Sequence, residues 1–158
     1  MVDVGHKPAT RRFAKARALV HLPEPAAAAL KAAVEGGHAK KGSPLHAAVV
    51  AGVMGAKRTS ELVPMCHAVP LDKVDVDLSV VVGGSDAAAG VVVVVECRAW
   101  ATHRTGVEME ALVGASVAAL TLYDMLKAAS HGIRIERVEL VEKTGGKRDY
   151  RAPETETE

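Results

Sequence analysis

Apolar and polar residues follow several different periods along the chain, and each period predicts a strand or a helix. Over residues 74–80, Val and Leu alternate with Asp and Ser, which predicts a strand with one face in water. The apolar run from Val91 to Ala101 predicts its partner, covered on both faces at its start. Residues 83–90 between them are rich in glycine and predict the loop of an antiparallel hairpin.

The last predicted strand changes its phase part-way along. Ile133 and Ile135 alternate in one phase, whereas Val138 and Leu140 alternate in the other. Because one extra residue moves the alternation to the opposite face of a strand, this pattern predicts a bulge near Glu136.

The beginning of the chain predicts a short strand and then a helix. The first fourteen residues are polar and irregular, and a strand is expected over residues 14–22. Two prolines then precede an alanine-rich run that Gly36 and Gly37 close, which is the usual pattern of proline at the start of a helix and glycine after its end.

A second helix is predicted after the basic loop at residues 38–43. Ser43 and Pro44 are typical of the cap and the first turn of a helix. Four small or apolar residues mark one face of it: Leu45, Val49, Gly52 and Ala56.

A third and longer helix is predicted between Thr105 and Lys127, with few bulky side chains. Its interior is mostly small: Ala111, Gly114, Ala115, Ser116, Ala118 and Ala119. Because such residues keep a helix thin, other backbones can approach it closely, and we expect this helix to be buried on all sides.

The predicted order is strand, two helices, two strands, long helix, strand. This order indicates an α+β fold of ferredoxin-like type, in which an antiparallel sheet has its helices packed on one face. We expect a single domain over residues 1–151, with an irregular N-terminal segment at 1–14 and a disordered acidic tail at 152–158.

Composition limits the classes of function. The chain has 158 residues with 20 Lys and Arg against 19 Asp and Glu, and this near balance argues against general binding to nucleic acid or to anionic membranes. The two cysteines form no CxxC pair, and no targeting signal is visible, so we expect a cytoplasmic protein.

Basic residues gather in four places along the sequence. The four groups are Arg11 with Arg12, Lys40 with Lys41, Lys57 with Arg58, and Lys143 with Lys147 and Arg148. If these groups converge in space, they would hold a polyphosphate, because phosphoryl oxygens require several cationic donors. The alternative is ordinary solvated surface charge.

A histidine and a cysteine lie between two prolines, in a segment without a helical or strand period. His67 is either a catalytic or substrate-binding imidazole or a structural histidine. Cys66 fits a small buried group better than a nucleophile. The remaining His and Cys residues are scattered, so no metal site is expected.

Charged residues mark both ends of the long helix. Glu108 and Glu110 near its start either bind a ligand or offset the helix dipole. Asp124 and Lys127 near its end should touch. Because the sequence around them is apolar, we expect a buried pair in which the pKa of the lysine is lowered, rather than an ordinary surface pair. Glu110 and Asp124 are about 20 Å apart along the axis, so we expect a subunit interface to combine the two ends.

Several motifs occur in one order along the chain. They are KKG at 40–42, GAKRTSELVPMCH at 55–67, TGVEMEAL from Thr105, ALTLYDMLK from Ala119 and KTGGK from Lys143. Together they resemble the cyclic pyranopterin monophosphate synthase family, which performs the second step of molybdenum cofactor biosynthesis. The likeness extends from Val2 to about Asp149.

The resemblance implies a ferredoxin-like subunit in a homohexamer, a trimer of dimers with active sites at subunit contacts. It implies a substrate that is a cyclised dihydro-GTP and the release of pyrophosphate. No redox cofactor is expected, because nothing in the chain would bind one. By this resemblance, Lys41 and Lys127 are the acid/base pair and Asp124 orients Lys127. The implied substrate-binding residues are Cys66, His67, Glu108, Met109, Glu110 and Lys143, with Arg12, Lys57 and Arg58 as candidates for holding the triphosphate.

Two other functions fit parts of the sequence. A non-catalytic trimeric nucleotide sensor on the same scaffold would need the phosphate-binding residues but not the Asp124 and Lys127 pair. A nucleotide pyrophosphohydrolase would need a carboxylate-rich metal site, and the chain has too few carboxylates in one place.

Overall fold

The computed structural model describes residues 1–36, 42–82 and 91–153, and over these residues the chain forms a five-stranded antiparallel sheet and four helices. The strands are β1 (Thr10–Leu22), β2 (Lys73–Val82), β3 (Val91–His103), β4 (Arg134–Thr144) and β5 (Tyr150–Arg151). The helices are α1 (Glu24–Val34), α2 (Pro44–Lys57), α3 (Thr59–Leu62) and α4 (Glu108–Leu126).

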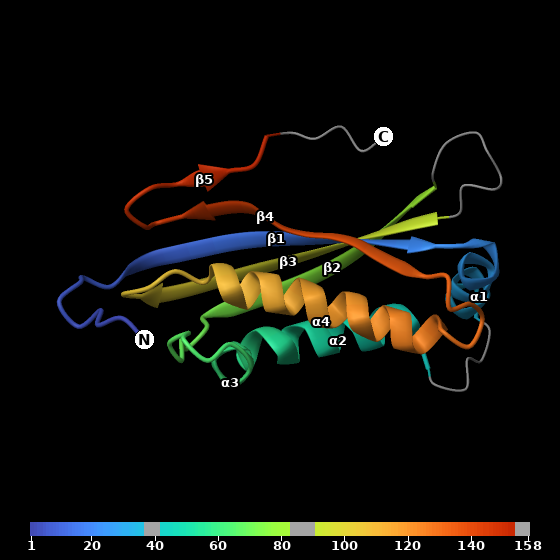
Figure 1. Cartoon of the computed structure of the whole chain (residues 1–158), viewed down its shortest axis with the longest axis horizontal. Coiled ribbons are helices and arrows are strands. Elements are labelled where there is room, and N and C mark those ends of the chain that lie inside the picture. Colours follow the sequence, from blue (N-terminus) through green and yellow to red (C-terminus); the bar gives the residue numbers. More distant parts are fainter. Residues whose placement is uncertain (37–41, 83–90, 154–158) are drawn as a thin grey trace.

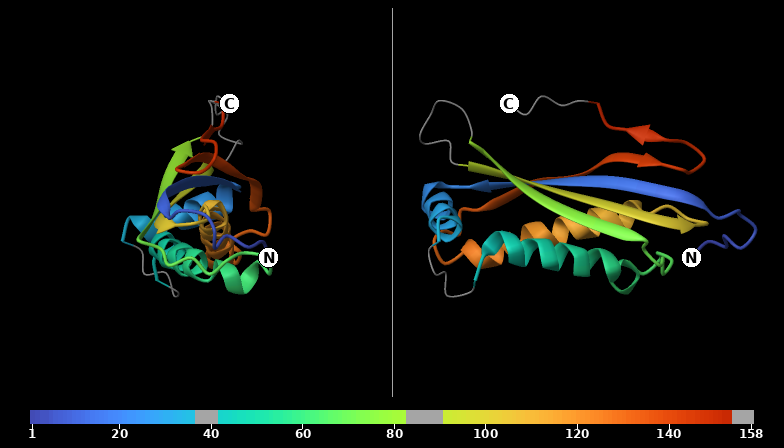
Figure 2. Two further views of the ribbon diagram at one scale, coloured as in Figure 1. Left: turned by 90° about the vertical axis from the view of Figure 1, so that its left-hand side faces the viewer. Right: turned by 180° about the vertical axis from the view of Figure 1, so that it is seen from behind.

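The prediction of an α+β, ferredoxin-like fold is confirmed. The strand order is β2-β3-β1-β4-β5, and α2 and α4 lie side by side along one face of the sheet (Figure 1). The end-on view shows both helices on the same side of the strands (Figure 2). Two short elements were not predicted from the sequence, namely α3 and β5.

The first strand is longer than predicted. β1 begins at Thr10, four residues before the predicted start at Ala14, and residues 10–13 belong to the strand rather than to the irregular segment. Its early part pairs with the end of β3, where Thr10 lies opposite His103 and Arg12 opposite Ala101. The arginines there hid the alternation, because both faces of the strand are polar at this end.

The hairpin of β2 and β3 and the bulge of β4 confirm the sequence pattern. Lys73 lies opposite Trp100 and the pairing is antiparallel, while the predicted loop at 83–90 lies outside the described residues. On β4 the partners of Leu19 and Val20 are residues 137 and 135, so Glu136 is the extra residue. A second shift, not predicted, leaves Val141 without a partner in register.

The two N-terminal helices begin as predicted. Pro25 lies in the first turn of α1, and the side chain of Ser43 accepts a hydrogen bond of 3.4 Å from the backbone N–H of His46 at the start of α2. The cap satisfies one of the amides that a helix leaves unpaired at its start.

Small residues let α4 approach both α2 and the sheet. A Cβ added to Gly114 would lie 2.5 Å from Sγ of Cys97 on β3 and 3.2 Å from the carbonyl of Gly52 on α2. The expectation of close packing is therefore confirmed, since neither contact leaves room for a side chain.

The expectation that α4 is buried on all sides is wrong for the single chain. One side faces the sheet and another faces α2, but Leu120 on the outer side is 59% exposed. The helix is apolar enough by composition to span a membrane, yet 44% of that span is buried within the chain, as expected for a helix that packs on a sheet.

Candidate active site

The first turn of α4 carries two carboxylates that face different parts of the molecule. Glu108 and Glu110 are two residues apart, which turns their side chains by about 200° around the helix axis. Oε1 of Glu108 lies 3.1 Å from Nζ of Lys143 on β4. Glu110 is 4% exposed. The start of α4 therefore lies between two polar sites.

The first site, which we call the basic pocket, surrounds Glu108. It has a volume of about 250 Å³ and is lined by Lys7, Arg12, Arg104, Thr105, Gly106, Glu108, Lys143, Thr144, Gly146 and Lys147. Three elements meet here because β1 pairs with both β3 and β4, which brings the loop before α4 beside the turn after β4. Members of two of the four basic groups thus converge, namely Arg12 from the first and Lys143 with Lys147 from the last.

Arg12 and Arg11 do not belong to the same site. Successive residues of a strand point to opposite faces, and Arg12 points into the basic pocket. Nε of Arg12 donates to the carbonyl of His103 at 3.1 Å, and Nη2 donates to the carbonyl of Arg104 at 3.3 Å. The neighbouring Arg11 is exposed and lies outside the lining of the pocket.

The turn after β4 is held firmly against β1. Gly145 has a φ of +84°, and a Cβ there would overlap the carbonyl of Arg11. Its backbone N–H donates to Oδ1 of Asp149 at 3.1 Å, and its carbonyl accepts from Oγ1 of Thr10 at 2.9 Å. Only glycine adopts this conformation without strain and fits this contact.

The second site, which we call the Glu110 pocket, lies on the other side of the α4 start. It has a volume of about 330 Å³ and is lined by Ala56, Lys57, Thr59, Ser60, Ala68, Val69, Pro70 and Glu110. Burial raises the pKa of Glu110, a backbone hydrogen bond opposes this rise, and the charge of Glu108 adds to it.

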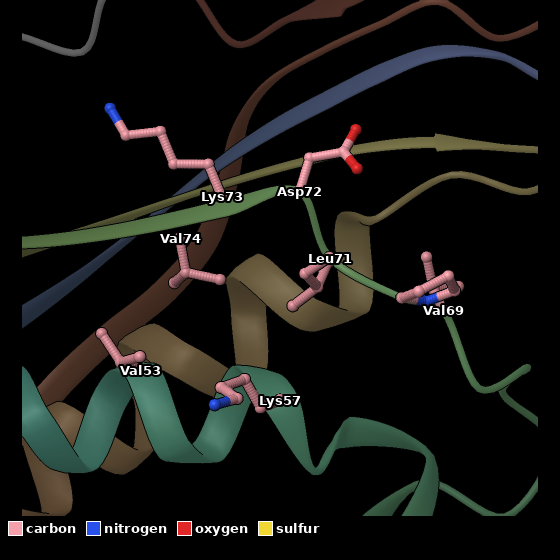
Figure 3. Close-up of a pocket in the computed structure, with 8 residues that line it drawn as sticks. Val53, Lys57, Val69, Leu71, Asp72, Lys73 and Val74 are labelled. Atoms are coloured by element: carbon pink, nitrogen blue, oxygen red, sulfur yellow. The ribbon is translucent and has the colours of Figure 1, made fainter.

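Lys57 also lines an adjoining pocket of about 370 Å³ between α2 and the start of β2 (Figure 3). In Figure 3 the side chains of Asp72 and Lys73 point away from α2. Oδ2 of Asp72 accepts from Thr102 at 3.1 Å, and Nζ of Lys73 lies 2.6 Å from Asp75. Lys57 is therefore the cation on the helix side of this pocket.

Cys66 and His67 lie close to the Glu110 pocket. Burial raises the pKa of the Cys66 thiol, and the charge of Glu110 raises it further, so the thiol stays protonated at neutral pH. Nε2 of His67 lies 2.8 Å from the carbonyl of Val2. A carbonyl only accepts, so Nε2 carries a proton and, in the neutral ring, Nδ1 is the acceptor.

The far end of α4 carries Asp124 and Lys127. Nζ of Lys127 lies 2.7 Å from Oδ1 of Asp124, and their side chains are 47% and 54% exposed. The hydrogen bond and the charge of Asp124 raise the pKa of Lys127. In the single chain the expectation of a buried lysine with a lowered pKa is therefore wrong, because the last turn of α4 lies at the surface.

One chain does not bring all the candidate residues together. Arg12, Glu108 and Lys143 share the basic pocket, and Lys57 and Glu110 share the Glu110 pocket. Arg58 lines none of the three pockets, and Met109 between the two carboxylates is partly exposed. Asp124 and Lys127 lie at the other end of α4, and Lys41 lies outside the described residues.

The sequence pointed to some of these residues only weakly. Lys7 and Arg104 line the basic pocket but are single cations in the sequence, with no lysine or arginine beside them to mark a basic group. Thr59 and Ser60 line the Glu110 pocket, and their only signal was their place beside Lys57 and Arg58. In residues 1–36, 42–82 and 91–153, no group of three or more His, Cys, Asp or Glu side chains is placed to hold a metal ion.

Comparison with known proteins decides the family. The model of the MoaC family matches residues 1–146, which include every catalytic and substrate-binding residue that the resemblance implied. The chain belongs to the MoaC family. The resemblance read from the motifs is thereby confirmed.

Relatives of this MoaC family member come from bacteria and from an animal. A cyclic pyranopterin monophosphate synthase of Xanthomonas campestris pv. campestris (strain B100) is 48% identical over 96% of this chain and 87% of that protein. The protein of the same name from Thermomicrobium roseum is 50% identical over 93% of this chain and 82% of that protein. Molybdenum cofactor biosynthesis protein 1 of Drosophila melanogaster is 45% identical over 98% of this chain and 26% of that protein.

Proposed function

We propose that this protein is a cyclic pyranopterin monophosphate synthase, a lyase of molybdenum cofactor biosynthesis. It converts a cyclised dihydroguanosine triphosphate into cyclic pyranopterin monophosphate and releases pyrophosphate. The observation that carries the proposal is the grouping of Glu108, Lys143 and Arg12 at the start of α4, beside the buried Glu110. Relatives at 48% and 50% identity bear the name of this enzyme.

The proposed active form is a homohexamer, a trimer of dimers, in the cytoplasm. Fourteen residues of helix, or about 21 Å, separate Glu110 from Asp124, which is too far for one small substrate to touch both. The outer sides of α2 and α4 expose Val50, Met54 and Leu120. An apolar surface of this kind favours contact with a second copy, and the contact would place the far end of one α4 beside the near end of another.

Such a contact would also change the chemistry of Lys127. In the single chain its ammonium is solvated and paired with Asp124, which favours the charged form. Burial against a second chain and the approach of other cations both disfavour that form, so Lys127 would release its proton more readily. This is the condition for general acid–base catalysis near neutral pH.

In the proposed mechanism the two ends of the helix have different tasks. Lys127 and Lys41 move the protons that open the five-membered ring of the guanine, and Asp124 orients Lys127 through their hydrogen bond. Glu108, Glu110, His67 and the neighbouring Cys66 and Met109 hold the pterin-forming part. The cations Arg12, Lys143, Lys57 and Arg58 are available for the phosphates, whose charge they neutralise. No redox cofactor takes part.

The variant Lys127→Ala tests the function. Product is measured by incubation with the cyclised substrate and chemical oxidation to a fluorescent pterin. The wild-type protein should form product, and Lys127→Ala should lose at least about a hundredfold in rate, as expected when a general acid or base is removed. The fold of each chain should stay as in the wild type, since the pair is exposed in the single chain and an exposed ion pair contributes little to stability.

The same experiment separates the two classes of function. A wild-type hexamer that folds and binds the substrate but forms no pterin would support the nucleotide sensor instead. A sensor would also keep its ligand binding in Lys127→Ala.

A further inference from the structure

The segment before β1 turns back to the part of the chain that carries Cys66 and His67. Figures 1 and 2 both place the N-terminal end beside the segment that follows α3. The contact uses the backbone, because the carbonyl of Val2 lies 2.8 Å from Nε2 of His67, 65 positions further along the sequence. We call residues 2–7 the N-terminal strap.

The strap contains a turn that its own hydrogen bonds hold. Oδ1 of Asp3 accepts from the backbone N–H of Gly5 at 2.7 Å, and the carbonyl of Val4 accepts from the backbone N–H of Lys7 at 3.1 Å. An aspartate that accepts from the backbone two residues further on is a common way to stabilise a turn. Asp3 therefore helps to fix the direction of the peptide group that joins it to Val2.

The two ends of the strap lie at different polar sites beside the start of α4. Lys7 lines the basic pocket, and Thr10 at the start of β1 donates to the carbonyl of Gly145 at 2.9 Å. The other end reaches His67 through Val2, close to the Glu110 pocket. The strap is therefore held at both ends.

The bond between the strap and His67 lies at the surface of the single chain. Because water competes for both of its partners, such a bond contributes little to the stability of the fold. Its main effect is on the imidazole ring. While Nε2 donates to Val2, the orientation of the ring is restricted, and in the neutral ring Nδ1 is the nitrogen that can accept.

We propose that the N-terminal strap positions His67 for the substrate, with the Val2 carbonyl as the contact and Asp3 as the side chain that holds it in place. The inference rests on the proposed function and extends it to residues outside its candidate set. Nδ1 of His67 accepts a hydrogen bond from an N–H or O–H group of the pterin-forming part. Val2 and Asp3 act only through His67, so they are positioning residues.

The imidazole nitrogens report the contact directly and without substrate. The assembled full-length protein is prepared with isotope-labelled histidine, and its nitrogen resonances are recorded at about pH 8, where an ordinary imidazole is mostly neutral. The resonances of His67 are those missing from His67→Ala. In the wild type they should show a protonated Nε2 and an unprotonated Nδ1.

Two substitutions of Asp3 separate the turn from the charge. In Asp3→Ala the His67 resonances should move towards those of free histidine, in which both tautomers are populated. Asp3→Asn keeps an oxygen that accepts from Gly5, so its His67 resonances should match the wild type. Gly5→Ala disturbs the same turn from its other side, because its Cβ would lie 3.1 Å from Oδ1 of Asp3.

Binding of cyclic pyranopterin monophosphate, measured calorimetrically, gives the functional readout. Asp3→Ala should weaken it about three- to tenfold, as expected for the loss of one positioned hydrogen bond. In a His67→Ala background the same substitution should change binding less than about twofold, because the ring on which the strap acts is gone. A merely structural strap would cause the same loss in both backgrounds.

Glu35→Ala is the control for the lost carboxylate. Glu35 follows the last residue of α1, and Figure 1 shows α1 at the opposite end of the molecule from the N-terminus. Its side chain is exposed, so this variant should leave the His67 resonances and product binding as in the wild type. Each variant is first shown to melt and assemble as the wild type does.

The inference is overturned if Asp3→Ala keeps the wild-type His67 resonances and product affinity, or if it loses the same affinity with and without His67. Its failure differs from that of the proposed function. A protein that forms product while Asp3→Ala has no effect refutes only the inference. One whose product binding depends on Asp3 through His67, but which forms no pterin from the cyclised substrate, refutes only the function.

Discussion

At the scale of single residues, position along the helix turn decides the chemistry of two similar carboxylates. Glu108 is partly open and has an ammonium partner in Lys143 at 3.1 Å. Glu110, two residues further on, is 4% exposed, and its pKa is raised by burial. A carboxylate with a partner in partly open surroundings keeps its charge easily, whereas a buried one bears a desolvation cost when it ionises.

The variant Glu110→Gln should therefore make the chain more stable at neutral pH. The folded state holds its proton to a higher pH than the unfolded state does, so the unfolded state binds fewer protons between the two pKa values. Stability then falls as the pH rises through this window. Glutamine does not ionise, so it avoids the cost of a buried charge. The free energy of unfolding in urea should therefore be higher for the variant than for the wild type at pH 7, and this difference should shrink towards pH 4.

The matched control for this prediction is Glu108→Gln, which removes a charge from the same turn and breaks the contact with Lys143. It should not stabilise the fold at pH 7. An equal gain for Glu110→Gln at both pH values would show that shape, rather than ionisation, controls the effect.

At the scale of elements, the sequence predicted those features of helices and strands that depend on residues adjacent in the chain. The change of phase in the last strand correctly predicted the bulge at Glu136, because one extra residue in a strand shifts the apolar positions that follow it by one. Proline in the first turn marked the start of α1, and the cap residue Ser43 marked the start of α2. The early start of β1 at Thr10 was missed because long-range pairing with β3, not the local pattern, holds those residues extended.

The sequence could not predict which side of α4 is covered. A run of small apolar residues indicates that another element packs closely against the helix. In the structure Gly114 faces both Gly52 on α2 and Cys97 on β3. On the outer side of α4, Leu120 is exposed. An apolar composition alone does not indicate whether a face of the helix is covered by the sheet of its own chain or by a second chain.

Close packing at Gly114 leads to a prediction for this element. Gly114→Ala should destabilise the fold by about 1–3 kcal/mol, because its Cβ would lie 2.5 Å from Sγ of Cys97 and the core has no room to move. Urea unfolding measures the loss. The helix propensity of alanine alone would have the opposite sign.

A second substitution checks the cause. Cys97→Ala removes the sulfur that the new methyl group meets, so the double variant should lose less stability than the sum of the two single variants. Purely additive losses would mean that the contact with Gly52, and not the sulfur, limits the space at this position.

At the scale of the whole molecule, the convergence of the site was only partly readable from the sequence. Arg12, Arg104 and Lys143 are far apart along the chain and meet because β1 pairs with β3 on one side and β4 on the other. Along the chain Arg11 and Arg12 form one basic group, whereas the strand turns their side chains to opposite faces. The roles of these residues stay predictions.

Mixing two inactive variants tests whether the site is shared between chains. Lys127→Ala damages one end of α4, and Lys143→Ala damages the site at the other end, about 20 Å away along the helix axis. If each active site takes its α4 ends from two chains, a mixed pair contains one site with both residues intact. Random pairing of equal amounts makes half of the pairs mixed, so about a quarter of the sites should work.

The two variants carry different tags, are co-expressed and are purified through both tags, so that every assembly in the assay contains both variants. Pterin formation by these assemblies is then measured. Each variant alone should be nearly inactive. If mixed assemblies are as inactive as the separate variants, then Lys127 and Lys143 serve the same site of one chain, which the geometry of α4 disfavours. Recovery would instead mean that the exposed pair of Asp124 and Lys127 is completed by a neighbour. The surface position of Lys127 in the single chain would then be the reason that assembly switches on its acid–base chemistry.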